Sequence, residues 1–108
     1  MISTEKETQK AILQYLDIRG IFHYRQNSGA FKAAHGGFIR FGAKGAPDIV
    51  CVFKGQYIGI EVKDVKGKLN DNQKEFQKKL EEAGGEYLVA RDVDDIVKYF
   101  EAELALKS

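Results

Sequence analysis

Two carboxylates and a lysine have the types and spacing needed for metal-assisted phosphate chemistry. Asp48 opens the apolar run DIVCVFK, and thirteen residues later Glu61 begins a Glu-Val-Lys triplet that ends at Lys63. Side chains alternate between the two faces of a strand, so Glu61 and Lys63 share one face while Ile58 and Ile60 take the other. Two charged groups on an otherwise apolar strand are costly unless something compensates them. This face is therefore a candidate site.

A tight turn between the two runs would bring the carboxylates together. A two-residue turn at Lys54-Gly55 pairs residues whose numbers sum to about 109, which places Asp48 level with Glu61. Adjacent carboxylates repel each other, and a hard divalent cation such as Mg²⁺, which prefers oxygen ligands, relieves that repulsion. The Val62 carbonyl could add a third protein oxygen. Lys63 would then stabilise charge on a phosphate or orient the attacking water.

The same residues have a plainer interpretation. Glu61 and Lys63 could form a surface ion pair on an edge strand, and Asp48 could merely begin a strand after Pro47. An isolated Glu-x-Lys favours that interpretation. The Pro-Asp upstream, the tight turn between the two runs and the basic surroundings together favour the metal site.

Basic residues are concentrated in the middle of the chain. Residues 19–68 contain nine Lys and Arg against three acids, an excess of six, whereas the rest contains eight against thirteen, a deficit of five. A face that meets a polyanion would explain this distribution, although scattered surface lysines would explain it too. The candidates for contacts with DNA backbone phosphates are Arg25, Arg40, Lys44 and Lys66.

The first half of the chain predicts a helix followed by extended segments. Thr4 and Glu7 form a capping-box pattern, and Gly20 is suited to end a helix, so a helix is expected over about residues 5–19. Residues 21–26 have strand character. The segment 31–44 is rich in Gly and aromatic residues around Gly36-Gly37, which predicts a hairpin or a mobile loop.

The second half predicts a hairpin, then a helix, a strand and a helix. Strands are expected at 48–54 and 57–63, a helix capped by Asn70 up to about residue 83, and a strand at 86–90. A last helix follows Asp92, with Ile96, Tyr99, Phe100 and Leu104 facing inward. The element order is therefore α-β-β-β-α-β-α.

Composition argues against several other classes. The chain has 108 residues, which fits one domain, and no apolar run approaches the ~18–20 residues of a membrane span. The polar first ten residues do not form a secretory signal. The single cysteine, Cys51, lies in an apolar run and is expected to be buried and inert, which fits a reducing, cytoplasmic setting. His23 and His35 lack a Cys/His cluster, which argues against zinc.

An ordered set of short motifs resembles a known nuclease family. The set comprises a first helix with Glu and Gln, RQNSG at 25–29, Gly-Ala-Pro-Asp at 45–48, Glu-Val-Lys at 61–63 and a following helix with Gln73. It resembles the PD-(D/E)XK nuclease superfamily, specifically the VRR-NUC (virus-type replication-repair nuclease) domain, to which archaeal Holliday-junction resolvases are similar. The resemblance covers nearly the whole chain. It implies one nuclease domain over residues 1–108, with a restriction-endonuclease-like α/β fold whose mixed central sheet is flanked by helices, and a phage or bacterial host cytoplasm.

The resemblance also implies an endodeoxyribonuclease that depends on Mg²⁺ or Mn²⁺. Asp48 and Glu61 would be metal ligands and Lys63 would be catalytic. Gln73 matches a glutamine that supports the site, although it could equally cap the start of its own helix. Ser28 matches a loop serine near the scissile phosphate in the resolvases, unless it is an ordinary polar loop residue.

The family further places an acidic residue of the first helix near the metal. One stripe at helical spacing consists of Glu5, Gln9, Ile12, Leu13 and Leu16. Glu5 and Gln9 would therefore be the polar residues on the core side, whereas Glu7 points about 200° away and already has a capping role. We expect Glu5 to be the additional metal ligand, while the resolvase spacing would favour a position nearer Gln9.

Substrate and assembly follow from the same resemblance. It points to branched replication and repair DNA, most of all Holliday junctions, and no element looks able to read base edges, so recognition by shape and backbone is expected. Symmetric cutting of a junction needs two active sites, which favours a C2 homodimer. Phe31, Phe38 and Phe41 could form its contact or belong to the core. The alternatives are a flap or nonspecific nuclease, a non-catalytic nucleic-acid-binding module of this fold, and a small α/β protein without a ligand.

Overall fold

A four-stranded mixed sheet forms the centre of the molecule. The computed structural model describes residues 4–26, 29–41 and 43–106. The strands of the sheet, in the spatial order β1-β4-β5-β6, are β1 (Phe22–Arg25), β4 (Ile49–Phe53), β5 (Gln56–Val62) and β6 (Glu86–Ala90). The β1–β4 and β4–β5 pairs are antiparallel, whereas β5 and β6 are parallel. The predicted α/β class and mixed central sheet are confirmed.

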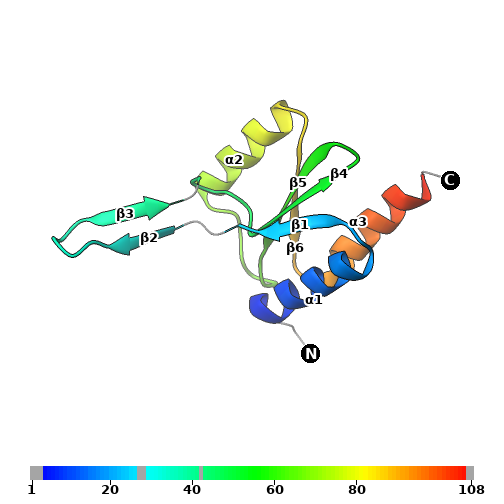
Figure 1. The fold of residues 1–108 in the computed structure, drawn as a ribbon, viewed down its shortest axis with the longest axis horizontal. Helices are drawn as coiled ribbons and strands as arrows, with labels where there is room; N and C mark the ends of the chain where they lie inside the picture. The colour runs from blue at the N-terminus through cyan, green and yellow to red at the C-terminus, as the bar shows by residue number, and fades with distance from the viewer. Residues whose placement is uncertain (1–3, 27–28, 42, 107–108) are drawn as a thin grey trace.

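A separate two-stranded hairpin lies outside this sheet. It consists of β2 (Gly29–Lys32) and β3 (Phe38–Phe41), and it extends away from the body of the molecule as a long arm (Figure 1). Gly36 adopts a φ of 104° in its turn, a conformation that glycine reaches without a steric penalty. Of the two alternatives for this segment, the structure has the hairpin. Its strands are additional to the predicted α-β-β-β-α-β-α order, which the remaining elements follow.

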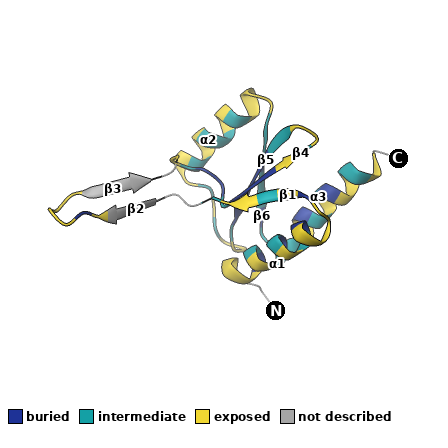
Figure 2. Cartoon of the chain, in the orientation of Figure 1, coloured by how far each residue is buried: buried dark blue, intermediate teal, exposed yellow. Residues whose placement is uncertain are grey.

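Three helices cover the two faces of the sheet. Helices α1 (Glu5–Ile18) and α3 (Val93–Ala105) contact each other on one face, and α2 (Asp71–Glu82) contacts β6 on the other (Figure 1). The core between the sheet and the α1–α3 pair is apolar, and burial is concentrated there and along β5 (Figure 2). Its fully buried large side chains include Ile12, Leu16, Ile49, Ile58, Ile60, Ile96 and Phe100. Among the described residues, no helix is long and apolar enough to cross a membrane.

Local capping signals set the helix ends close to the predicted positions. Thr4 and Glu7 form the expected capping box at α1, and Gly20, with a φ of 67°, follows the C-cap residue. Asn70 caps α2 and Asp92 caps α3, each by accepting a hydrogen bond from a backbone N–H of the first turn. Each predicted boundary is therefore within a residue or two of the observed one.

The register of the central hairpin is the one predicted from its turn. Ile49 pairs with Ile60, so residue numbers across β4 and β5 sum to 109. Lys54 and Gly55 both have positive φ angles, 53° and 76°, as a two-residue turn of this type requires. Because Asp48 directly precedes Ile49, it lies level with Glu61, on the opposite face from the apolar core.

Two details of burial refine the sequence interpretation. The buried residues of α1 are Thr8, Ile12 and Leu16, so the core-facing stripe passes through Thr8, while Gln9 is half-buried and Glu5 is exposed. Cys51 is fully buried, and burial raises the pKa of its thiol to about 12. The prediction that this cysteine is buried is confirmed, and the raised pKa is consistent with the expected low reactivity.

Candidate active site

Asp48 is fixed at the end of the β4–β5 ladder by a bond from the neighbouring strand. Its Oδ2 accepts a hydrogen bond of 2.8 Å from the Val62 backbone N–H. The register of β4 and β5, continued two residues beyond the Ile49–Ile60 pair, places Pro47 opposite Val62, and proline has no N–H to donate to the Val62 carbonyl. A paired residue of an antiparallel strand directs its N–H and its C=O to the same neighbour. The Val62 carbonyl is thus expected on the Asp48 side, without a ladder donor.

Glu61 is a buried carboxylate with one oxygen engaged and the other without a partner. The residue is 5% exposed, and its Oε2 accepts a 2.9 Å hydrogen bond from Gln73 Nε2 and lies 3.5 Å from Lys63 Nζ. Its Oε1 is buried without a hydrogen-bond partner among the described residues. A buried carboxylate oxygen without a partner destabilises a fold, so this atom needs a ligand or a proton.

The two carboxylates perturb each other electrostatically. Burial, and then the negative charge of Asp48, raise the pKa of Glu61 to about 7, although Lys63 opposes the shift. Burial also raises the pKa of Asp48, against the Val62 N–H bond and the charge of Lys63. Raised carboxyl pKa values in a polar cluster are typical of sites that bind a cation or transfer a proton.

Gln73 makes two contacts, one that caps its own helix and one with Glu61, and its support of an active site stays a prediction. Its Oε1 accepts a 2.9 Å hydrogen bond from the Asn70 N–H, which completes the capping box of α2. Its Nε2 donates to Glu61 at the same distance. One side chain therefore ties the start of α2 to the buried carboxylate.

Lys63 lies between the end of the β5–β6 pairing and a turn that Arg91 anchors, an arrangement that was not predicted from the sequence. Its N–H donates to the Ala90 carbonyl, which extends the β5–β6 pairing past Val62. Arg91, the residue after Ala90, donates from Nη1 to the carbonyls of Asp64 and Gly67 in the turn that follows Lys63. The only sequence signal for Arg91 was its position just after the last strand, and its partners lie more than twenty residues earlier in the chain.

Gly45 is a second site residue whose role was not predicted. A Cβ at this position would lie 2.1 Å from the Asn72 backbone oxygen, and its φ is 77°. Only glycine permits this contact between the loop before Asp48 and the start of α2. Tyr87 Oη also donates to the Gly45 carbonyl at 3.3 Å. The packing of this loop against α2 therefore requires the glycine of the Gly-Ala-Pro-Asp motif.

Glu5 lies near the carboxylate pair without completing a set of three. Its negative charge is a minor cause of the raised pKa values of Asp48 and Glu61. It is exposed in the first turn of α1. Within residues 4–26, 29–41 and 43–106, no three His, Cys, Asp or Glu side chains are grouped closely enough to hold one ion. Its role as a metal ligand stays a prediction.

The predicted DNA contacts are only partly described. Arg25, Lys44 and Lys66 are exposed, and the positive charge of Arg25 lowers the pKa of Asp48, so Arg25 is close to the site. Arg40 lies in β3, but its side chain is outside the described part of the structure, as are those of Phe31, Phe38 and Phe41, and Ser28 is outside it altogether.

Comparisons with known proteins identify the fold. No protein-family model and no curated protein matches the chain. A solved structure described as "VRR_NUC domain" superposes with a TM-score of 0.67 at 20% identity, covering 92% of this chain and 97% of that one. Another, described as "VRR_NUC domain protein", has a TM-score of 0.60 at 18% identity, covering 94% and 88%. Identities this low establish the fold alone: the chain has the restriction-endonuclease-like fold of VRR_NUC domains, as the motif resemblance predicted.

Proposed function

We propose that this chain is a metal-dependent DNA nuclease that hydrolyses phosphodiester bonds at the Asp48–Glu61–Lys63 site. The observation that carries the proposal is the buried Glu61 carboxylate, with an oxygen that lacks a partner and a pKa raised to about 7. A purely structural role would favour an apolar residue here, because an ionised carboxylate in this position costs stability. The shared fold with VRR_NUC domains supports the same proposal.

The donor set fits a hard divalent cation. Asp48 and Glu61 supply carboxylate oxygens, and the Val62 carbonyl supplies a third, which is the ligand type that Mg²⁺ and Mn²⁺ take. Glu5 is the candidate for a further ligand or for a contact with the cation's hydration shell. When bound, the cation would neutralise the carboxylate pair and polarise the substrate phosphate.

The remaining residues orient the substrate and stabilise charge. Lys63 Nζ, at 3.5 Å from Glu61 Oε2, would stabilise the negative charge that develops on the phosphate or orient the attacking water. Gln73 would hold the Glu61 carboxylate in one orientation through its 2.9 Å bond. Because Gln73 is also part of the α2 cap, the fold itself fixes that orientation.

Branched DNA is the proposed substrate, with Holliday junctions first. The exposed Arg25, Lys44 and Lys66 would attract backbone phosphates without reading sequence. A C2 homodimer would present two sites to a symmetric junction. A monomer would suit a flap instead.

A cleavage panel tests the function and the substrate together. The purified protein with Mn²⁺ would be incubated with a four-way junction, a 5′ flap, a linear duplex and a single strand, and its mass would be measured in solution. A dimer that cuts the junction in paired strands is expected. A monomer that prefers the flap would replace the junction proposal, and binding without any cleavage would favour the non-catalytic module.

A further inference from the structure

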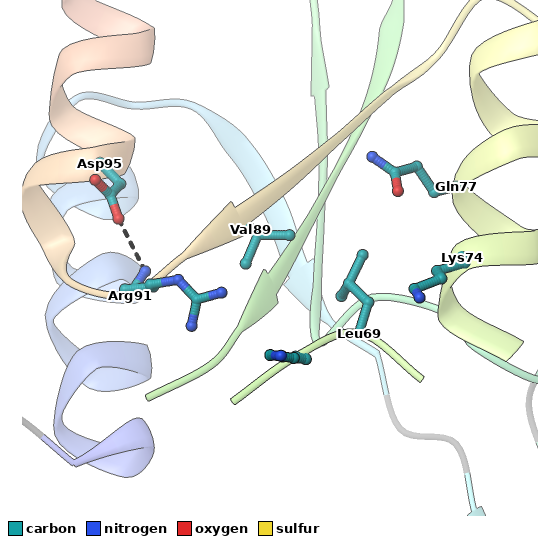
Figure 3. A pocket seen from close by; sticks show the side chains of 7 residues that line it. Leu69, Lys74, Gln77, Val89, Arg91 and Asp95 are labelled. Atoms are coloured by element: carbon teal, nitrogen blue, oxygen red, sulfur yellow. Dashed lines mark hydrogen bonds between the residues drawn. The ribbon is translucent and has the colours of Figure 1, made fainter. Parts of the chain in front are cut away.

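A basic cavity lies beside the proposed active site and has no role in it so far. Its volume is about 760 Å³. Figure 3 shows the side chains that line it. Its apolar lining consists of Leu69 and Val89, and its polar lining contains three cations and one acid. These polar residues are Lys68, Lys74, Gln77, Arg91 and Asp95.

The cations that line this cavity are only partly engaged by the residues that the structure describes. Lys68 and Lys74 are exposed, and neither ammonium forms an ion pair with a residue that the structure describes. Arg91 is held by bonds from Nη1 to two backbone carbonyls, and its backbone N–H donates to Asp95 Oδ2 at 2.9 Å. The Asp95 carboxylate is thus partly engaged, and the cavity keeps an excess of positive charge.

Residues that line the cavity are neighbours of the proposed active-site residues, either across the sheet or along the chain. Val89 pairs with Glu61 across the β5–β6 ladder, and neighbouring strands are about 4.8 Å apart. Lys74 directly follows Gln73 in α2. Gln77 lies four residues after Gln73, which is about one helical turn and a rise of about 6 Å. Arg91 also anchors the turn that follows Lys63. A strand bound at the carboxylates therefore has the cavity as its next contact on the β6 side.

We infer that this cavity binds the sugar-phosphate backbone of one nucleic-acid strand, one or two nucleotides from the cleaved bond. The inference rests on the proposed function and adds a second contact surface to it. The cations of the lining would bind phosphates, and Leu69 and Val89 would contact the sugar or a base face. Pockets of about 300–1,000 Å³ hold ligands of nucleotide size, so the cavity suits a single strand rather than a whole duplex.

The test is a binding experiment without catalysis. Affinity for a fluorescent single-stranded oligonucleotide would be measured in EDTA at several salt concentrations, for the wild type, for K68Q/K74Q and for the control K10Q/K98Q. The control removes the same charge from exposed positions on α1 and α3 that do not line the cavity, of which Lys98 forms an ion pair with Asp94. Thermal melting would check that both variants are folded.

The expected result is weaker binding by the cavity variant alone. At low salt K68Q/K74Q should bind about tenfold more weakly for each ammonium that meets a phosphate in the wild type. The slope of its affinity against salt should fall by about 0.7 for each phosphate that is no longer neutralised. Equal weakening in K68Q/K74Q and K10Q/K98Q would overturn the inference. Failure of the nuclease proposal would be seen separately, as normal binding with no cleavage when Mn²⁺ is added.

Discussion

Replacing Glu61 with Gln should stabilise the metal-free protein at neutral and alkaline pH. In the unfolded chain this carboxyl titrates near its ordinary pKa of 4.5, whereas burial and the Asp48 charge raise the pKa to about 7 in the folded protein. Below pH 4.5 the carboxyl is protonated in both the folded and the unfolded state, so it does not lower the free energy of unfolding. Between 4.5 and 7 the folded state holds more protons than the unfolded state, so stability falls as the pH rises.

The size of the effect follows from the two pKa values. One pKa unit corresponds to about 1.4 kcal/mol, so the difference between 4.5 and about 7 lowers the free energy of unfolding by about 3 kcal/mol. This loss is complete above pH 7. Solvent screens little of this, because the residue is 5% exposed. Glutamine cannot ionise, and its amide oxygen can still accept from Gln73. Asp48, whose pKa is also raised, adds a smaller dependence of the same sign that stays in the variant.

Urea unfolding in EDTA between pH 4.5 and 8 would measure this difference. The wild type should lose about 3 kcal/mol more of its free energy of unfolding over that range than E61Q. The control E82Q, which removes an exposed carboxyl at the end of α2, should keep the wild-type profile. Parallel profiles for wild type and E61Q would refute the claim that Glu61 is a costly buried acid. Added Mg²⁺ should recover the lost stability only where Glu61 is present.

Five further substitutions, at four residues, separate the roles of residues around the pair. E5Q should lower the cleavage rate by more than about tenfold, whereas E7A should lower the melting temperature by removing the side chain that accepts from the Thr4 N–H in the α1 capping box. The reverse pattern would show that the assignment of Glu5 is wrong. Q73A should weaken the α2 cap by roughly 0.5–2 kcal/mol and reduce cleavage, while Q73E should keep the cap and lose stability above pH 7 through repulsion by Glu61; equal stability of Q73E and wild type at pH 8 would contradict the contact. R91K should speed amide hydrogen exchange in residues 64–67, since an ammonium cannot reproduce the guanidinium's bonds to two carbonyls; unchanged exchange would show that the turn does not depend on Arg91.

Features encoded by neighbouring residues were predictable from the sequence. The caps at Thr4 and Asn70 depend on a side chain and a backbone N–H three residues apart. The hairpin register depends on the turn at Lys54-Gly55, which fixes every pair up to Ile49 and Ile60. Since alternation along β5 then decides the faces, the placement of Asp48 beside Glu61 followed without knowledge of the rest of the fold.

Features that depend on tertiary distances were not predictable in the same way. The second bond of Gln73 requires α2 to begin over β5, and the Arg91 anchor requires the end of β6 to lie beside the turn after Lys63. The contact of Gly45 with Asn72 depends on the same placement of α2. Helical periodicity predicts which side of α1 faces the sheet only to within one residue position. Packing against the sheet buries Thr8, whereas the predicted stripe passed through the adjacent Gln9.

The rate of DNA cleavage as a function of divalent cation concentration tests the central claim most directly. The wild type, D48N and E61Q would be compared on a four-way junction with Mn²⁺ or Mg²⁺ and in EDTA, with circular dichroism to check the fold of each. The account predicts saturable, metal-dependent cleavage by the wild type, none in EDTA, and none by either folded variant. Cleavage by both variants, or wild-type cleavage that persists in EDTA, would contradict the proposed metal site.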